Sequence, residues 1–182
     1  MSKAIGMVEY LTVSTGVVAA DTMVKTADVE IIEAQTVCPG KYIVIISGEL
    51  SAVRAAVDAS KALYDEKLID SFVLGNPDES IFSAIYGSTS LGKVDALGVL
   101  ETYSAASIIV AADTAAKTAE VDLIELRIAK GMCGKSYMFI TGSVASVTAA
   151  IERTKNQMED NGFFLDSSII AKPDEKLWQT LI

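Results

Sequence analysis

One cysteine stands in the middle of the stretch QTVCPGKYIVIISGEL, residues 35–50. A cysteine thiolate is a nucleophile and a ligand for soft metal ions. Cys38 shares the 182-residue chain with one other cysteine, Cys133. One cysteine can neither fill the coordination sphere of a structural metal nor close a disulfide within its own half of the chain. By residue type alone, a lone cysteine in an apolar chain is most often an inert small hydrophobe.

The composition of the chain excludes several other kinds of chemistry. The sequence contains no histidine, which removes the commonest general base and the histidine-ligated zinc sites. The formal net charge is −9, so nucleic acid is not an expected partner. Apolar runs are far shorter than the roughly 18 residues that span a bilayer, and the N-terminus resembles no signal peptide, so we expect a cytosolic protein without a membrane partner. No pair of carboxylates suggests acid–base catalysis, and we expect the chain not to be an enzyme.

The chain contains the same domain twice. AADTMVKTADVEII at residues 19–32 recurs as AADTAAKTAEVDLI at residues 111–124. Such a long internal match indicates a tandem duplication, and we predict domains at residues 1–88 and 94–182 with a linker over residues 86–94. The paired segments are 4–10 with 96–102, 19–32 with 111–124, 39–60 with 133–154, and 70–82 with 166–178.

Each copy has the pattern strand, helix, strand, strand, helix, strand, short helix. In the first copy, strands are expected near residues 4–10, 29–37, 41–47 and 68–74. Pro39-Gly40 is typical of a turn between two strands, and a short final helix is expected from Pro77 or Asp78. The order βαββαβ predicts an α/β (α+β) protein of two ferredoxin-like domains, each a sheet with helices on one face.

These duplicated motifs resemble the bacterial microcompartment shell domain, over nearly the whole chain. The resemblance implies a homotrimer that forms a six-sided, pseudohexameric tile and packs with other shell proteins around an enzyme-filled compartment in the cytoplasm. Closed cyclic symmetry would then bring equivalent loops of three chains to one axis.

The motif T-x-C-P-G-K, here Thr36 to Lys41, resembles a branch of this family in which the central loop carries a metal cluster. The resemblance implies that Cys38 from three chains holds one [4Fe–4S] cluster per trimer, with an enclosed redox enzyme as a possible electron partner. Cluster ligands are usually cysteine thiolates, so the fourth iron would be left to water, a small thiol or another protein. Backbone N–H groups after the proline are expected to help carry the cluster's negative charge.

The same resemblance places further residues of both copies around the central opening. In the first copy these are Val37, Pro39 and Gly40, and in the second copy Met132, Cys133 and Gly134. The loop KGMCGKSY departs from the glycine-rich loop of that branch. Cys133 is interpreted as a passive loop thiol, with a place near the cluster as the alternative.

Three lysines are candidates for the edges at which tiles meet. Lys25 and Lys117 occupy the same place in the two copies, where the alternative is a solvated helix end that complements the helix dipole. Lys172 keeps a basic group where the family usually has an arginine, whereas the first copy has Asn76 there.

Three functions therefore remain open for the chain. It can be a shell protein whose cluster moves electrons across the shell or is delivered to an enclosed enzyme. It can be a shell protein without a cluster, whose central pore conducts a small metabolite. It can also be a free ferredoxin-like trimer that binds a small effector.

Overall fold

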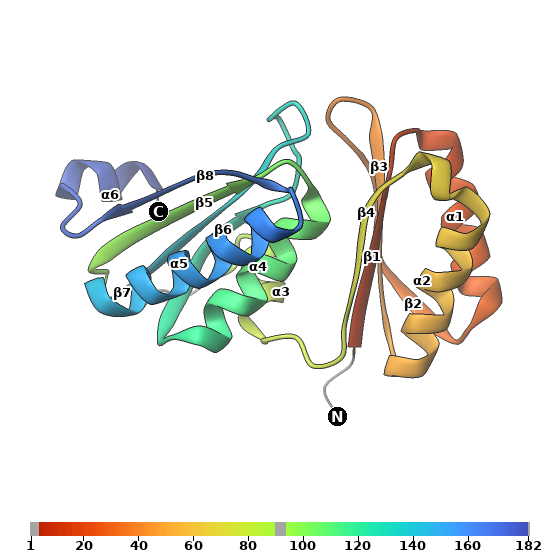
Figure 1. The fold of residues 1–182 in the computed structure, drawn as a ribbon, viewed down its shortest axis with the longest axis horizontal. Helices are drawn as coiled ribbons and strands as arrows, with labels where there is room; N and C mark the ends of the chain where they lie inside the picture. Colours follow the sequence, from red (N-terminus) through yellow and green to blue (C-terminus); the bar gives the residue numbers. More distant parts are fainter. Residues whose placement is uncertain (1–3, 90–93, 182) are drawn as a thin grey trace.

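The computed structural model describes residues 4–89 and 94–181. It contains two antiparallel sheets of four strands, with strand orders β2-β3-β1-β4 and β6-β7-β5-β8. Two long helices cover one face of each sheet (Figure 1). The predicted βαββαβ order is therefore confirmed in both halves of the chain.

The elements of the first domain are β1 (Ala4–Tyr10), α1 (Val13–Thr26), β2 (Val29–Val37), β3 (Lys41–Gly48), α2 (Leu50–Tyr64), the 3-10 turn η1 (Asp65–Lys67), β4 (Leu68–Leu74) and α3 (Ser80–Ile85). Those of the second domain are β5 (Ala96–Thr102), α4 (Ala105–Thr118), β6 (Val121–Arg127), β7 (Ser136–Gly142), α5 (Val144–Asp160), β8 (Phe164–Ile170) and α6 (Glu175–Leu181).

The short helix α3 begins later than the sequence predicted. It starts at Ser80 because the Asp78 carboxylate accepts hydrogen bonds from the Ser80 N–H (3.0 Å) and hydroxyl (2.6 Å), which holds residues 78–80 in a turn. Of the predicted linker 86–94, residues 90–93 lie outside the described residues, as do the outer ends of the predicted domains, residues 1–3 and 182.

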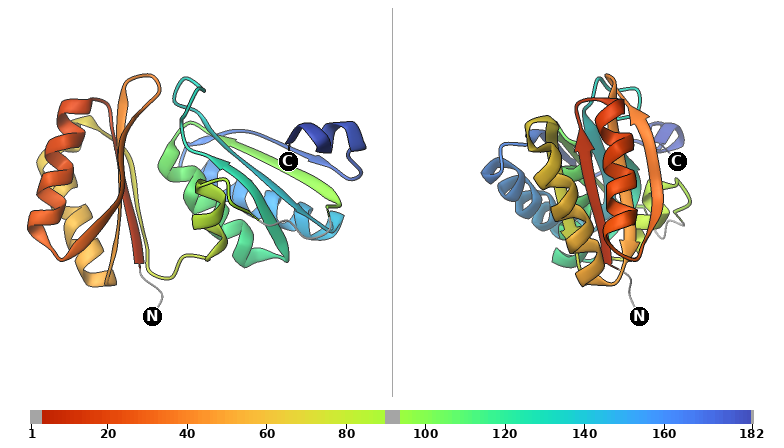
Figure 2. Two further views of the ribbon diagram at one scale, coloured as in Figure 1. Left: turned by 180° about the vertical axis from the view of Figure 1, so that it is seen from behind. Right: turned by 90° about the vertical axis from the view of Figure 1, so that its right-hand side faces the viewer.

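Strand β1 is buried on both faces along its whole length. Ala4, Val8 and Tyr10 pack against the helices of their own domain. Ile5 and Met7 belong to the core that includes α4 of the second domain. Side chains alternate between the faces of a strand, so the sheet of the first domain is covered on both sides. The prediction of one covered face holds for the second domain but is wrong for the first, because α4 lies against the sheet's other face (Figure 2).

Helix α1 lies close to the sheet where it contains glycine. A Cβ atom built on Gly16 would lie 2.4 Å from the Cβ and Cδ1 atoms of Tyr42 on β3. The Tyr42 Cβ atom is fixed by the backbone and cannot rotate away. Gly16 therefore sets how closely helix and sheet approach.

We predict that Gly16→Ala lowers the free energy of unfolding by about 2 kcal/mol, because overpacking outweighs the gain in helix propensity. Denaturant unfolding followed by circular dichroism measures this change. Ser14→Ala, at an exposed position of the same helix, is the matched control and should change stability little. Equal stability of the two variants would contradict the packing argument.

Candidate functional site

Cys38 lies half-buried on the short loop that joins β2 to β3. The register of the two strands extends to the pair Val37↔Lys41, so three residues form the loop. The Cys38–Pro39 peptide bond is cis, and Gly40 has a φ of 110°, a conformation that favours glycine. Pro39 and Gly40 are exposed, whereas Val37 is buried beneath them.

The corresponding loop of the second domain lies against the Cys38 loop. The Cys38 N–H donates to the carbonyl oxygen of Ala129 at 3.0 Å. A Cβ atom built on Gly134, whose φ is 87°, would lie 3.1 Å from the Cys38 carbonyl oxygen. Cys133 is exposed with a φ of 53°, and Met132 is half-buried. The structure thus brings the two predicted pore loops together within one chain, while their position at a pore stays a prediction.

A shallow hollow of about 440 Å³ surrounds Cys38. Residues 36–40 line it together with Lys130 and Gly131, and Lys130 is the charged side chain among these lining residues. The first amide after the proline does not face the thiol freely, because the Gly40 N–H donates to the Val37 carbonyl oxygen at 2.9 Å. This N–H group is therefore engaged within the loop, and a role of the amides after the proline in carrying the charge of a cluster stays a prediction.

Lys130 is held by an acidic residue on the edge strand β2. Its Nζ atom lies 3.2 Å from Oε1 of Glu33, with 52% of the lysine side chain and 17% of the glutamate side chain exposed. Gln35 also donates to Glu33 Oε1. The other oxygen, Oε2, is buried without a hydrogen-bond partner among the described residues. Burial, and secondarily the Glu33 charge, raises the pKa of Tyr86.

A second cluster of polar and charged side chains lies on β6 and β7. Arg127 and Tyr137 both donate to the carboxylate of Glu125, at 2.6 Å and 2.9 Å. Burial raises the pKa of Tyr137 to about 12, and its hydrogen bond to Glu125 acts in the same direction. The same carboxylate raises the pKa of Arg127. With its pKa raised, Tyr137 stays protonated at neutral pH and Arg127 stays charged, which argues against a role of these two side chains in proton transfer.

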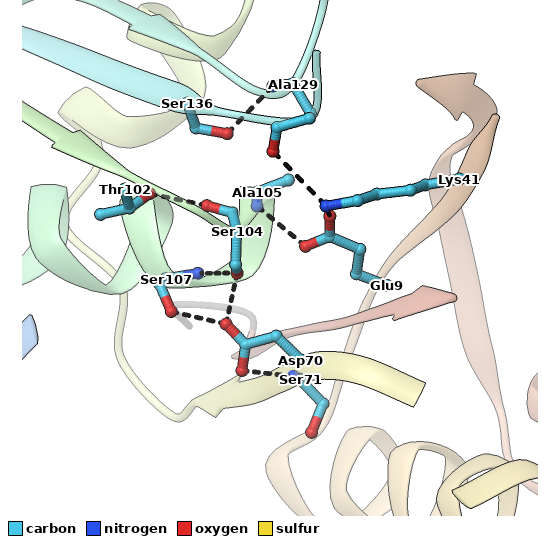
Figure 3. A network of polar contacts seen from close by, with 11 residues as sticks. Glu9, Lys41, Asp70, Ser71, Thr102, Ser104, Ala105, Ser107, Ala129 and Ser136 are labelled. Atoms are coloured by element: carbon cyan, nitrogen blue, oxygen red, sulfur yellow. Dashed lines mark hydrogen bonds and ion pairs between the residues drawn. The ribbon is translucent and has the colours of Figure 1, made fainter. Parts of the chain in front are cut away.

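The two domains are joined through a fully buried carboxylate, Glu9 (Figure 3). One oxygen accepts from Lys41 Nζ at 2.9 Å, and the other accepts from the Ala105 N–H, at the first turn of α4, at 2.8 Å. Lys41 also approaches the Gly134 carbonyl oxygen at 3.4 Å. Only 14% of the Lys41 side chain is exposed, so this lysine stabilises the contact between the two domains.

Asp70 on β4 makes the second polar contact of the junction. Its Oδ2 atom accepts from the hydroxyls of Ser104 and Ser107, at the start of α4. The sequence prediction missed Glu9 and Asp70. A signal was present, because the aligned copies keep a glutamate at position 101 and an aspartate at position 166.

The three predicted edge lysines have different surroundings. Lys25 is exposed and pairs with Asp21 at 2.6 Å. Lys117 pairs with Asp113 at 2.7 Å and also donates to the Asn76 carbonyl oxygen of the first domain at 2.6 Å. Lys172 is exposed. Lys117 therefore already bridges the two domains, and a role in contacts between tiles stays a prediction for all three.

No group of three or more cysteine or acidic side chains that could hold a metal ion occurs within the described part of a single chain. Among the described residues, no helix has the length and hydrophobicity required to cross a membrane.

We predict that Glu9→Gln destabilises the chain by about 3 kcal/mol, because Lys41 then stays buried without a compensating charge. Glu152→Gln, at an exposed position of α5, is the control. Thermal or denaturant unfolding of both variants measures the difference. An unchanged midpoint for Glu9→Gln would show that the ion pair does not hold the junction.

The comparisons with known proteins agree with this architecture. Residues 4–77 and 96–173 each match the family described as "BMC domain". The chain is 36% identical over 182 residues to the bacterial microcompartment shell protein PduT of Citrobacter freundii, covering 100% of this chain and 99% of that protein.

Two solved structures have a similar fold. A microcompartment protein from Desulfitobacterium hafniense DCB superimposes with a TM-score of 0.86 at 42% identity, covering 98% of this chain and 99% of that chain. A fused permuted hexameric shell protein from the RMM microcompartment has a TM-score of 0.67 at 20% identity, covering 87% and 82%; this match supports the fold alone. From the duplicated sequence, the paired βαββαβ domains and these matches, the chain belongs to the BMC-domain family of bacterial microcompartment shell proteins.

Proposed function

We propose that three copies of the chain form a closed six-domain tile of a microcompartment shell, in which Cys38 of each chain contributes to one [4Fe–4S] cluster on the threefold axis. The observation that carries the proposal is the contact between the two domains. Each chain has the partners of this contact a second time, on the sheet of the second domain and at the start of α1. Repeating the contact between chains produces either a ring or an open filament, and the proposed tile is the ring.

The Asp70 contact has a complete second set of partners. Asp166 of the second domain aligns with Asp70 and is exposed. Thr12 and Thr15 align with the two serines at the start of α4, and they lie at the start of α1. Threonine hydroxyls donate as serine hydroxyls do. Thr15 is buried and accepts a hydrogen bond from the Thr12 hydroxyl at 2.9 Å. In the trimer, Asp166 of one chain accepts from the exposed Thr12 of the next, whose hydroxyl turns from Thr15 to the carboxylate.

The Glu9 contact is duplicated in the same way. Glu101 is half-buried, and Lys135, which aligns with Lys41, is exposed. The Val13 N–H at the start of α1 corresponds to the buried Ala105 N–H of α4. The next chain thus supplies the helix N-terminus that Glu101 lacks within its own chain.

The apolar surfaces support the same pairing. Val13, Val17 and Val24 on α1 are 39%, 51% and 40% exposed. At the positions of Val13 and Val17, α4 has Ala105 and Ile109, which are fully buried against the rest of the chain. Exposed apolar side chains clustered on one helix indicate a protein interface, and the free sheet face of the second domain of another copy is the matching surface.

The short helices α3 and α6 also show one contact made within the chain and one left open for another chain. Helix α3 of the first domain packs across the domain boundary against β6, with Ile81 and Ala84 buried. The aligned helix α6 has no buried residue among those described, and Leu177, which aligns with Ile81, is 37% exposed. In the trimer, α6 packs against β2 of another chain, where Ile31 is 43% exposed.

The Cys38 loop fits a cluster shared between chains. Cys38 lies half-buried on the β2–β3 loop, beside the loop that carries the exposed Cys133, and threefold symmetry would turn it into three equivalent thiols around one axis. A [4Fe–4S] cluster supplies one-electron chemistry when bound. The chain's own contribution is to hold the thiols at fixed positions in the tile, so that electrons can pass between the two sides of the shell. The proposed partners are other shell proteins and an enclosed redox enzyme.

We predict that Val17→Asp converts the trimer into monomers, because it places a charge in the apolar contact of α1 with the next chain. The mass by light scattering should fall from three times 19.2 kDa to 19.2 kDa, with circular dichroism unchanged. Leu63→Asp, at a 61% exposed leucine of α2, is the control and should remain trimeric. A wild-type protein that is monomeric at micromolar concentration would contradict the assembly.

We predict that anaerobically purified protein contains about four irons per trimer and that Cys38→Ser abolishes this content. Iron and sulfide analysis, visible absorption and electron paramagnetic resonance after reduction measure the cluster. Cys133→Ser is the matched control and should retain it. A trimer that stays colourless after anaerobic reconstitution would overturn the cluster, and the metabolite pore would become the function to test.

A further inference from the structure

Helices α1 and α4 carry the same acid–lysine pair near their C-terminal ends. Among the described residues, the pair on α4 binds the other domain, whereas the pair on α1 has no partner outside its own helix. We infer that Asp21 and Lys25 of α1 clamp the next chain of the tile: Asp21 accepts from the Asp174 N–H of that chain, and Lys25 donates to its Lys172 carbonyl oxygen. The inference rests on the closed ring of the proposed function and does not depend on a cluster. It gives Lys25 a role between chains of one tile, in place of the contact between tiles that the family resemblance implies.

The contact made by α4 within the chain shows what such a pair does. Oδ1 of Asp113 accepts from the Asp78 N–H at 2.9 Å, and Nζ of Lys117 donates to the Asn76 carbonyl oxygen at 2.6 Å. The two side chains also pair with each other at 2.7 Å. The pair thus binds the backbone on both sides of Pro77, across the boundary between the domains.

Helix α1 presents the same pair in the same geometry. Asp21 and Lys25 align with Asp113 and Lys117, and their own ion pair is 2.6 Å long. Both helices have 14 residues, and the capping residues at each end have nearly the same dihedral angles in the two copies. The pair on α1 is therefore already arranged for the contact that α4 makes.

The segment that receives the pair also occurs a second time. Lys172-Pro173-Asp174 aligns with Asn76-Pro77-Asp78. In both copies the aspartate carboxylate accepts from the N–H two residues later, at 2.9 Å in the second and 3.0 Å in the first. The second copy thus forms the same turn before another chain is bound. Because the contact uses backbone atoms, a lysine can stand where the first copy has an asparagine.

The exposure of these side chains indicates a contact that still lacks its partner. The Asp113 side chain is 8% exposed, whereas that of Asp21 is 56% exposed. The two lysine side chains differ in the same direction, with 44% of Lys117 and 73% of Lys25 exposed. Each group on α1 is therefore more open than its counterpart on α4, which already has its partner.

The clamp acts at the opposite end of α1 from the contact of Thr12 with Asp166. Within the chain, α4 is held at both ends in this way, by Ser104 at its start and by Lys117 in its last turn. One contact alone would leave a helix free to pivot on the sheet, whereas two contacts fix the angle between neighbouring domains. This angle decides whether repeated contacts close into a ring or continue as a filament.

The test measures how fast chains exchange between tiles. Unlabelled protein is mixed with the same protein labelled with heavy nitrogen, and native mass spectrometry follows the appearance of mixed trimers. Lys25→Met keeps the apolar stem but removes the charged donor at all three junctions, so it should speed exchange about tenfold or more. Asp21→Ala removes the acceptor and should act in the same direction.

Two controls separate the clamp from a general effect of charge. Lys155→Met removes a lysine that pairs with Glu159 four residues away, on a helix that the proposed contact does not use, and should leave the exchange rate unchanged. Lys25→Arg retains a charged donor and should exchange close to the wild-type rate. If Lys25→Arg exchanges as fast as Lys25→Met, the effect is one of packing and the inference fails.

The role of Lys25 at the edge between tiles predicts a different outcome. In that case, Lys25→Met should exchange chains at the wild-type rate and lose only the sheets of tiles seen by electron microscopy, which would overturn the inference and leave the ring intact. A wild-type protein that is monomeric would instead refute the ring, and the clamp with it. The mass of the wild type therefore distinguishes failure of the proposed function from failure of the inference alone.

Discussion

The arrangement of the two domains depends on one buried carboxylate. Glu9 is fully buried, and a charge in such a place is stable only when it is paired and hydrogen-bonded. Its two partners come from different parts of the chain, Lys41 in its own sheet and the N-terminus of α4 in the other domain. Satisfying both at once fixes the position of the helix on the sheet. Because Lys41 also approaches Gly134, the same contact places the two central loops side by side.

This contact explains why a duplicated chain suits a tile. Each domain has one sheet face that a helix must cover and one helix that must pack against a sheet. A single domain cannot place its own helix on that face, so the two surfaces are covered by another domain. Within one chain the first sheet receives α4, and one sheet face and one helix, α1, remain open at opposite ends. A closed ring leaves no such surface open, which is the physical reason why the proposed trimer closes. In that trimer, the interfaces between chains repeat the interface that folding already forms.

Much of the fold could be predicted from the sequence, because the two copies support each other. The apolar positions of α2 recur in α5 and identify the core face, and the turn at Pro39-Gly40 is where the chain reverses. The sequence could not predict which helix packs against which sheet face. Periodicity shows that β1 is apolar, but not that its second face packs against α4. The sequence around Lys41 likewise does not indicate whether its side chain is solvated or paired with a buried carboxylate. The contact between the two loops gave no signal either, since its hydrogen bond joins residues 91 positions apart in the chain, Cys38 and Ala129.

Duplication also changes what the centre of the tile can contain. A ring of six identical domains would repeat any central side chain six times. In this chain the two loops differ: the first carries Cys38 and Pro39, and the second carries Met132, Cys133 and Gly134, whose missing side chain allows close approach to the Cys38 carbonyl oxygen. In the proposed trimer, each kind of loop therefore occurs three times, and the two kinds alternate around the axis. A ligand set of three Cys38 thiols needs this arrangement, because a ring of six identical loops would supply six. The second copy of the domain thus completes the environment of the site that the first copy begins.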